Sequence, residues 1–266
     1  SIREKRLVLG MLNIATDVGN LSLNGWINTT YKFGDKTFFK VGDELNLQGN
    51  FNNFDISYFN IYFPWEQDTR GFLYGDFEIY GLAEAPLIEL KSQIEKPKFD
   101  LIEGEKLDGI IIYKNDRLFL KRLNLFTNLG QYTGSGSIPA NLNFVKMNKI
   151  DIRKMPVDFI FTGKSTSLEF FPPYFELIDT IMGQYNFQLN LSGNLNELNR
   201  EGQITVQNGT LNLLQIDNPI TNINGIAKMS NNQLIINKLT ANMRPGEKSK
   251  SIISDIINLS KNLFNS

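Results

Sequence analysis

The chain has 266 residues, and its 27 Lys and Arg against 28 Asp and Glu give a formal net charge of -1. This balance offers no basic surface for nucleic acid or for an anionic membrane. The sequence contains neither cysteine nor histidine, which excludes disulfides, thiolate metal sites, cysteine nucleophiles and histidine general bases. No uninterrupted apolar run approaches the roughly 20 residues that a membrane-spanning helix needs.

Apolar and polar residues alternate with a period of two in several segments, which predicts strands with one dry face and one wet face. The segments, in chain order, are 21–27, 44–51, 157–161, 183–193 and 203–206. Between such segments lie residues that favour turns, at 114–116, 208–209 and 230–232. The sequence therefore predicts a mostly β protein with an antiparallel sheet of meandering strands.

Two segments are predicted to be short amphipathic helices. In 167–182, two prolines precede Tyr174, Leu177, Ile178 and Ile181, whose three- and four-residue spacing suits a helix that begins at the prolines. In 247–264, isoleucine and leucine form one stripe and lysines lie off it. This basic terminal helix could contact a membrane surface or a partner helix, but such helices more often pack on their own domain.

An internal repeat is visible in the spacing. The alternating segment 71–81 matches 183–193 at an offset of 112 residues, and 109–123 matches 225–239 at an offset of 116. Repeated strand units usually indicate an elongated, stacked architecture. We therefore divide the chain into a partial N-terminal β-unit (1–70), a repeat that ends in a short helix (71–182), a second repeat (183–246) and a C-terminal amphipathic helix (247–266).

Two passages carry a resemblance to a known family. One runs through 202–211, 217–225 and 232–236, and the other through 109–123 and 130–139. In order and spacing they resemble the TamB/AsmA-like envelope proteins, named after the translocation and assembly module. These proteins are bacterial members of the repeating β-groove, bridge-like lipid-transfer proteins. The similarity extends over about 71–243, whereas residues 1–70 resemble the family only in their general character.

The resemblance implies an elongated, curved antiparallel sheet, the β-taco, whose concave apolar face is open along one side. It implies a non-enzymatic segment, without cofactor, that carries phospholipid or another acyl-chain lipid between the inner and outer bacterial membranes. The location would be the periplasm or cell envelope, with an inner-membrane anchor in a part of the protein that this chain does not contain.

The apolar positions of the alternating segments are the expected lining of the lipid groove. They are Leu73, Phe77, Ile79, Ile111, Tyr113, Leu118, Leu120, Tyr185, Phe187, Leu189, Leu191, Ile204, Val206, Leu234 and Ile236. The predicted helix with Tyr174, Leu177, Ile178 and Ile181 would plug or cover the groove. An ordinary core and a simple cap on the sheet are the competing roles of these two sets.

Several alternatives stay open at this point. A β-sandwich would bury the same dry faces against a second sheet. Within the same family, the chain could instead assist outer-membrane protein insertion, with an outer-membrane β-barrel as partner of the open sheet edge. A secreted carbohydrate-binding or adhesive β-protein would present exposed aromatic residues on one face, and Trp26, Tyr74 and Tyr80 are the candidates. The acidic residues at 76, 78, 103, 105 and 108 are expected to be solvated surface rather than a glycosidase pair or a metal site.

Overall fold

The structure is a computed structural model that describes residues 5–29, 35, 37–58, 69–99, 102–146, 155–170, 177–194, 196–216, 218–231 and 233–243. Most of these residues lie in strands, so the prediction of a mostly β protein is confirmed. The strands are β1 (Lys5–Ala15), β2 (Asn20–Thr29), β3 (Glu44–Asp55), β4 (Thr69–Leu82), β5 (Ala85–Phe99), β6 (Ile102–Glu103), β7 (Lys106–Lys114), β8 (Arg117–Thr127), β9 (Gly130–Pro139), β10 (Val157–Ser167), β11 (Ile178–Asn194), β12 (Glu197–Leu213), β13 (Ile220–Ser230) and β14 (Gln233–Met243).

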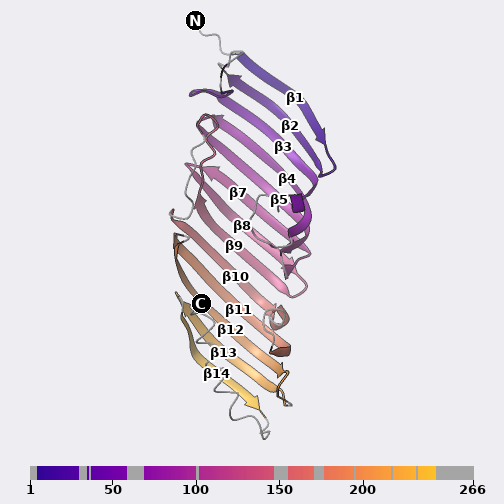
Figure 1. Cartoon of the computed structure of the whole chain (residues 1–266), viewed down its shortest axis with the longest axis vertical. Coiled ribbons are helices and arrows are strands. Elements are labelled where there is room, and N and C mark those ends of the chain that lie inside the picture. The colour runs from indigo at the N-terminus through magenta and orange to yellow at the C-terminus, as the bar shows by residue number, and fades with distance from the viewer. Residues whose placement is uncertain are drawn as a thin grey trace. The chain divides into compact units, whose positions relative to one another are not determined.

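The strands form one 14-stranded sheet in which neighbours in the sequence are neighbours in space. The order is β1-β2-β3-β4-β5-β7-β8-β9-β10-β11-β12-β13-β14, and the short β6 pairs with β5. The pairs from β1 to β8 and from β11 to β14 are antiparallel. The chain divides into two compact units, Ser1–Phe126 with Gly134–Val157, and Thr127–Thr133 with Asp158–Ser266. Within each unit, successive strands lie side by side (Figure 1).

The prediction of a helix at 167–182 is wrong for the described residues of this range, 167–170 and 177–182. Leu177 lies in a turn, and Ile178 and Ile181 belong to β11. Tyr174 and the helix predicted for 247–264 lie outside the described residues. Across the part of the chain that the structure describes, the helical elements are 3-10 turns at 56–58 and Leu168–Phe170, and no α-helix occurs.

A β-bulge explains the mistaken helix. In the pairing of β11 with β12, Ile178 lies opposite Leu213 and Ile181 lies opposite Leu211, so that Asp179 is the extra residue. A bulge shifts the alternation by one position. Two apolar residues three positions apart therefore point to the same face of a strand, which is the spacing that also characterises a helix.

The predicted turn residues have mixed outcomes. Asn115 and Asp116 connect β7 with β8 and have positive φ angles of 50° and 55°, which suits a two-residue hairpin turn. Asn231 connects β13 with β14 and has a φ of 52°. Asn208, however, lies inside β12, and its φ of 51° marks a bulge rather than a turn.

The repeat includes the N-terminal strands, which sequence reasoning had left as a partial unit. Strands β1, β8 and β14 carry apolar residues at the same spacing of two, then three. These residues are Leu7, Leu9 and Leu12 in β1, Leu118, Leu120 and Leu123 in β8, and Leu234, Ile236 and Leu239 in β14. In each strand, the register shifts between the second and the third apolar residue.

The connection after β1 recurs after β8. The Thr16 hydroxyl donates a hydrogen bond to the carbonyl oxygen of Gly19 at 2.9 Å, and the Thr127 hydroxyl donates to that of Gly130 at 3.0 Å. Both glycines have positive φ angles, 151° and 147°. The two turns lie 111 residues apart in the sequence.

A third irregularity recurs between β4–β5 and β11–β12. Gly71, with φ 139°, marks a register shift opposite the segment that contains Lys96, whose φ is 48°. Gly183, with φ 119°, marks a shift opposite the segment that contains Asn208. Glycine adopts such angles freely, whereas other residues do so at a cost. Both pairs of positions are separated by 112 residues.

Side-chain volume is exchanged between equivalent positions of the two repeats. In the first, Phe51 of β3 lies opposite Gly75 of β4. In the second, Gly163 of β10 lies under the ring of Phe187 of β11, so a side chain at Gly163 would collide with that ring. The position that holds phenylalanine in the first repeat holds glycine in the second, and the reverse is true on the neighbouring strand. The total side-chain volume of the two positions is therefore the same in both repeats, as packed cores require.

These recurrences define a repeat of six strands. Strands β1–β5 and β7 form the first repeat, β8–β13 form the second, and β14 occupies the position that begins each repeat. The boundary that the sequence suggested between 182 and 183 falls inside β11.

The best-buried cluster of the first unit lies at one end of the strands. Ile27, Leu45 and Ala83 are 7%, 2% and 0% exposed, and Phe39 and Phe144 pack against them with ring centroids 5.6 Å apart. The segment that follows β9 is held there because the Phe144 amide donates to the Ala83 carbonyl at 2.9 Å.

We expect Gly183→Ala to lower the free energy of unfolding by about 1–3 kcal/mol, the cost of holding a non-glycine residue in a sparsely populated backbone region. The new Cβ atom would also lie 2.7 Å from the Cα atom of Gly209. Gly10→Ala in β1 is the control, because no atom lies within 4 Å of its Cβ position. Urea unfolding of both variants measures the difference, and equal losses would contradict the strained bulge.

Candidate functional site

One face of the sheet in the first unit is apolar across seven strands. The registers place residues opposite one another in continuous rows that run across the strands. Two such rows are Leu9, Gly25, Leu47, Ile79, Ile88, Tyr113 and Leu118, and Leu12, Leu23, Gly49, Phe77, Leu90, Ile111 and Leu120. With strands about 4.8 Å apart, seven strands extend over roughly 29 Å. We call this surface, together with its counterpart in the second unit, the apolar face.

The second unit has rows of the same kind. They are Tyr185, Val206, Gly225 and Leu239, then Phe187, Ile204, Ala227 and Ile236, then Leu189, Gly202, Met229 and Leu234. Rings pack along β11, where the centroids of Tyr185 and Phe187 are 6.0 Å apart. Tyr132 of β9 lies nearby, with its hydroxyl oxygen 3.3 Å from that of Tyr185.

All the predicted lining residues lie on the apolar face of their own unit. Tyr113 and Tyr185 are buried, at 2% and 3% exposure, and Ile236 is 47% exposed. The other predicted lining residues are half-buried. The period-two alternation was thus sufficient to find which residues share a face.

The predicted lining includes no residue of β1, β2, β3 or β5, which are four of the seven strands in the rows of the first unit. Strand β5 contributes Ile88 and Leu90 to the rows, along with Ile94 opposite Leu73. Its alternation was available in the sequence, but Leu87 points to the other face and interrupts the pattern.

No second sheet covers the apolar face within the described ranges, because every strand there belongs to the same sheet. A β-sandwich, in which a second sheet made of these strands would pack against the apolar face, is therefore not the fold. Within the described ranges, turns and loops cover the ends of strands. Leu168, in the 3-10 turn after β10, is 4% exposed and lies over Gly209 of β12, and Ile56 occupies the equivalent turn after β3 at 6% exposure.

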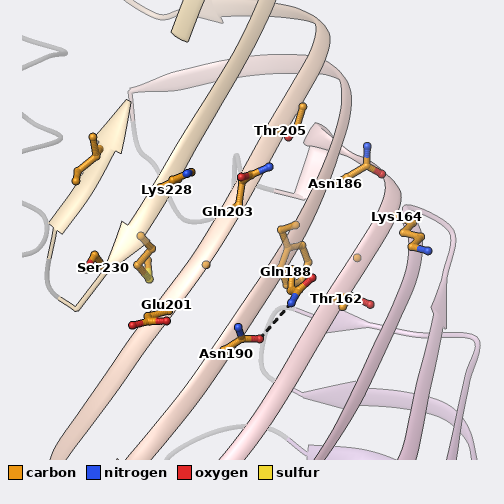
Figure 2. A pocket seen from close by; sticks show the side chains of 15 residues that line it. Thr162, Lys164, Asn186, Gln188, Asn190, Glu201, Gln203, Thr205, Lys228 and Ser230 are labelled. Carbon is orange, nitrogen blue, oxygen red and sulfur yellow. Dashed lines mark hydrogen bonds between the residues drawn. The ribbon is translucent and has the colours of Figure 1, made fainter. Parts of the chain in front are cut away.

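Two hollows open on the opposite, polar face. One, of about 690 Å³, lies in the second unit over β10–β14 (Figure 2). Gln188, Gln203 and Lys228 line it in one row across the strands, and the Gln188 amide donates to Asn190 at 3.4 Å. Phe187, Met229 and Ile235 also line this hollow, so its wall combines amides and charges with apolar side chains.

The other hollow, of about 470 Å³, lies in the first unit. Asp76 and Glu78 of β4 line it with Lys91 of β5, and Lys91 is directly opposite Asp76. The carboxylates at 76 and 78 thus belong to the polar face, beside a cation. In the described stretches, no three acidic side chains are grouped so that they could hold a metal ion.

The aromatic residues considered for carbohydrate binding lie on the polar face but do not form a cluster. Trp26 is covered by the Arg6 guanidinium, 4.5 Å from its ring centroid. The Tyr80 hydroxyl donates to Glu89 at 3.2 Å, and burial, followed by the negative charge of Glu89, raises the pKa of Tyr80. The Tyr74 hydroxyl donates to Asn53, near the other end of β4. Each ring is therefore engaged by a neighbouring polar group.

Tyr113 connects the apolar face to the segment 140–146. Its hydroxyl donates to Asp116 at 3.0 Å and accepts a hydrogen bond from the Leu142 amide at 3.0 Å. Burial raises the pKa of Tyr113, the contact with Leu142 lowers it, and the Asp116 carboxylate raises it, with a net increase.

The comparisons with known proteins identify no relative. No protein-family model matches the sequence, and neither the curated proteins nor the solved structures contain a significant match. None of the helical segments in the described ranges has the length and apolar character required to cross a membrane.

We expect Tyr113→Phe to lower the free energy of unfolding by about 1 kcal/mol near neutral pH, because the Leu142 amide loses its hydrogen-bond acceptor. The pH dependence has a definite sign. A folded-state pKa above that of the unfolded chain means that the tyrosine stabilises the fold below pH 10, and that this contribution is lost as the pH rises through 10 and beyond. Between pH 8 and pH 11, the free energy of unfolding should therefore fall less steeply for the variant than for the parent chain, as denaturant unfolding at each pH would measure. Parallel curves would contradict this role of Tyr113.

Proposed function

We propose that the apolar face binds the acyl chains of lipids, and that the chain is a segment of a bridge-like protein that carries phospholipids between two membranes. The single observation that supports the proposal is the set of continuous apolar rows, half-exposed and without a covering sheet among the described strands. Monomeric soluble proteins rarely leave contiguous apolar patches of such extent uncovered unless the patch binds something.

The energetics favour hydrocarbon as the ligand. Each methylene group that leaves water contributes about 0.8 kcal/mol, so a chain of about sixteen carbons gains on the order of 12 kcal/mol along an apolar wall. The charged head group would remain in water. A ligand of this kind needs no directional partner, which agrees with a face made of leucine, isoleucine, valine and phenylalanine.

Repetition favours transfer over storage. Because β1, β8 and β14 present leucine or isoleucine at equivalent positions, a hydrocarbon chain meets similar surfaces at each repeat. Similar surfaces have similar binding free energies, so no position retains the lipid. Our proposal includes the finer architecture that the resemblance implies, an elongated sheet that curves around its apolar face as a groove, in the bacterial periplasm between inner and outer membranes.

A second candidate function uses the sheet edge. A module for outer-membrane protein assembly would pair its edge strand with a strand of an outer-membrane barrel. The exposed apolar residues of β14 favour it, since Ile235 and Leu239 are 50% and 58% exposed. Binding to a barrel partner that is insensitive to salt, without bound lipid, would support this function over lipid transfer.

We expect Leu189→Asp to abolish lipid co-purification while leaving the strand-rich circular dichroism spectrum intact. Leu189 is half-buried in a row of the second unit, and a carboxylate there would have to be desolvated by a bound acyl chain. Mass spectrometry of organic extracts from the purified chain measures the bound lipid.

Gln188→Asp is the matched control, because Gln188 is adjacent, exposed and on the polar face. It introduces the same charge without touching the apolar face, so bound lipid should equal that of the parent chain. Equal loss in both variants, or no lipid in the parent chain, would contradict the proposal. Unfolding by Leu189→Asp alone would instead identify Leu189 as closed core.

A further inference from the structure

The outer edge of β14 lacks the features that usually protect an edge strand. In the described part of the chain, β14 is the last strand in the order and pairs with β13 alone. It has 11 residues, no proline and a single charged residue, Lys238. Natural sheets usually blunt such an edge with several charges, a proline or a short strand. A long edge without these features is suited to pairing with a further strand.

The repeat shows what kind of strand fits this edge. Strand β14 is equivalent to β8 and to β1, as their shared apolar spacing and register shifts show. Strand β8 pairs with β7 on one side and with β9 on the other. Strand β1 pairs with β2, the equivalent of β9. In both cases, one neighbour of this type of strand is a strand that begins at, or directly after, a glycine with a positive φ.

Exposure agrees with a missing neighbour. Leu239 and Ile236 of β14 are 58% and 47% exposed, whereas the equivalent Leu123 and Leu120 of β8 are half-buried between two strands. Leucine and isoleucine are alike in size and polarity, so the difference in exposure arises from the strands that surround each residue. A strand of the β2 or β9 type on the outer edge would flank these side chains within the sheet, as β9 flanks those of β8.

We propose that the outer edge of β14 binds an extended strand of the β2 type, supplied by another polypeptide chain, in antiparallel orientation and in the register that joins β1 to β2. This binding continues a pairing that the sheet already contains. It does not depend on lipid binding, because the strand would add to the edge and leave the apolar face free.

The register can be stated by residue. In the β1–β2 pair, Leu9 lies opposite Gly25 and Leu12 lies opposite Leu23. Ile236 and Leu239 are the equivalents of Leu9 and Leu12. A bound β2 strand should therefore place its residue 23 opposite Leu239, with its residue 24 pointing to the other face.

Cysteine cross-linking tests this register, because the chain contains no cysteine of its own. The probe is a synthetic peptide of residues 19–29 that carries either Leu23→Cys or Asn24→Cys. The full-length chain carries Leu239→Cys, a change at an exposed side chain. Side chains directly opposite in an antiparallel pair lie about 4.5–5.5 Å apart, and closest where the two residues do not exchange hydrogen bonds, so they are near disulfide distance. We expect the Leu23→Cys peptide to form a disulfide in several-fold higher yield than the Asn24→Cys peptide, and excess peptide without cysteine to suppress it.

Leu123→Cys is the matched control variant, because it occupies the equivalent position in β8 between two strands. It should form no more disulfide than the mismatched peptide does. Equal yields at positions 23 and 24, equal yields with Leu239→Cys and Leu123→Cys, or no reaction with Leu239→Cys would each overturn the proposal. Absence of reaction would mean that the edge is occupied by another segment or does not accept a strand. Lipid content measured in the same samples keeps this result separate from that of the lipid proposal.

Discussion

The strict two-residue period of a β-strand is the constraint on which the rest of this structure depends. In a single sheet, a shift of one residue between neighbouring strands moves every apolar side chain to the wet face. Here apolar rows remain continuous across seven strands of the first unit. Where a strand carries an extra residue, as at Lys121 in β8 or Asn237 in β14, the apolar spacing changes from two to three at the same place. The spacing of apolar residues in the sequence therefore changes where the pairing register changes, and the apolar side chains stay on one face.

A sheet without a covering layer has to obtain its stability mainly from neighbouring strands. Few hydrophobic side chains in the described residues are fully buried, and they lie mostly near strand ends, as Leu45 and Leu168 do. Cross-strand pairs contribute roughly 0.2–1 kcal/mol each, so many such pairs are needed. This favours a long repetitive sheet, since every added strand contributes pairs with its neighbour alone. The exchange of Phe51 and Gly75 for Gly163 and Phe187 shows that packing within the layer is conserved even where individual residues are not.

Alternation in the sequence was enough to predict the fold class and the shared face, but not the positions where alternation is interrupted. Tyr185, Phe187, Leu189 and Leu191 alternate without a break, and their common face was predicted correctly. Ile178 and Ile181 are separated by a bulge at Asp179, and a helix was predicted there. Strand β1 was not predicted at all, because its bulge divides the apolar residues into two short groups. A bulge is defined by its partner strand, so one strand read alone does not contain the information that distinguishes it from a helix.

The same repetition determines the properties of the face and of the edge. Leu9, Leu120 and Ile236 occupy equivalent positions in their strands, so in our proposal a hydrocarbon chain would meet no preferred position along the face. An edge strand that copies an interior strand retains the hydrogen-bonding geometry and the apolar side chains that interior strands use for two neighbours. In β14 these side chains, Ile236 and Leu239, remain exposed. Lipid would be bound by the side chains of the face, whereas a further strand would be bound by the backbone of the edge. A repetitive sheet can therefore be lengthened at its edge without altering the surface that we propose binds lipid.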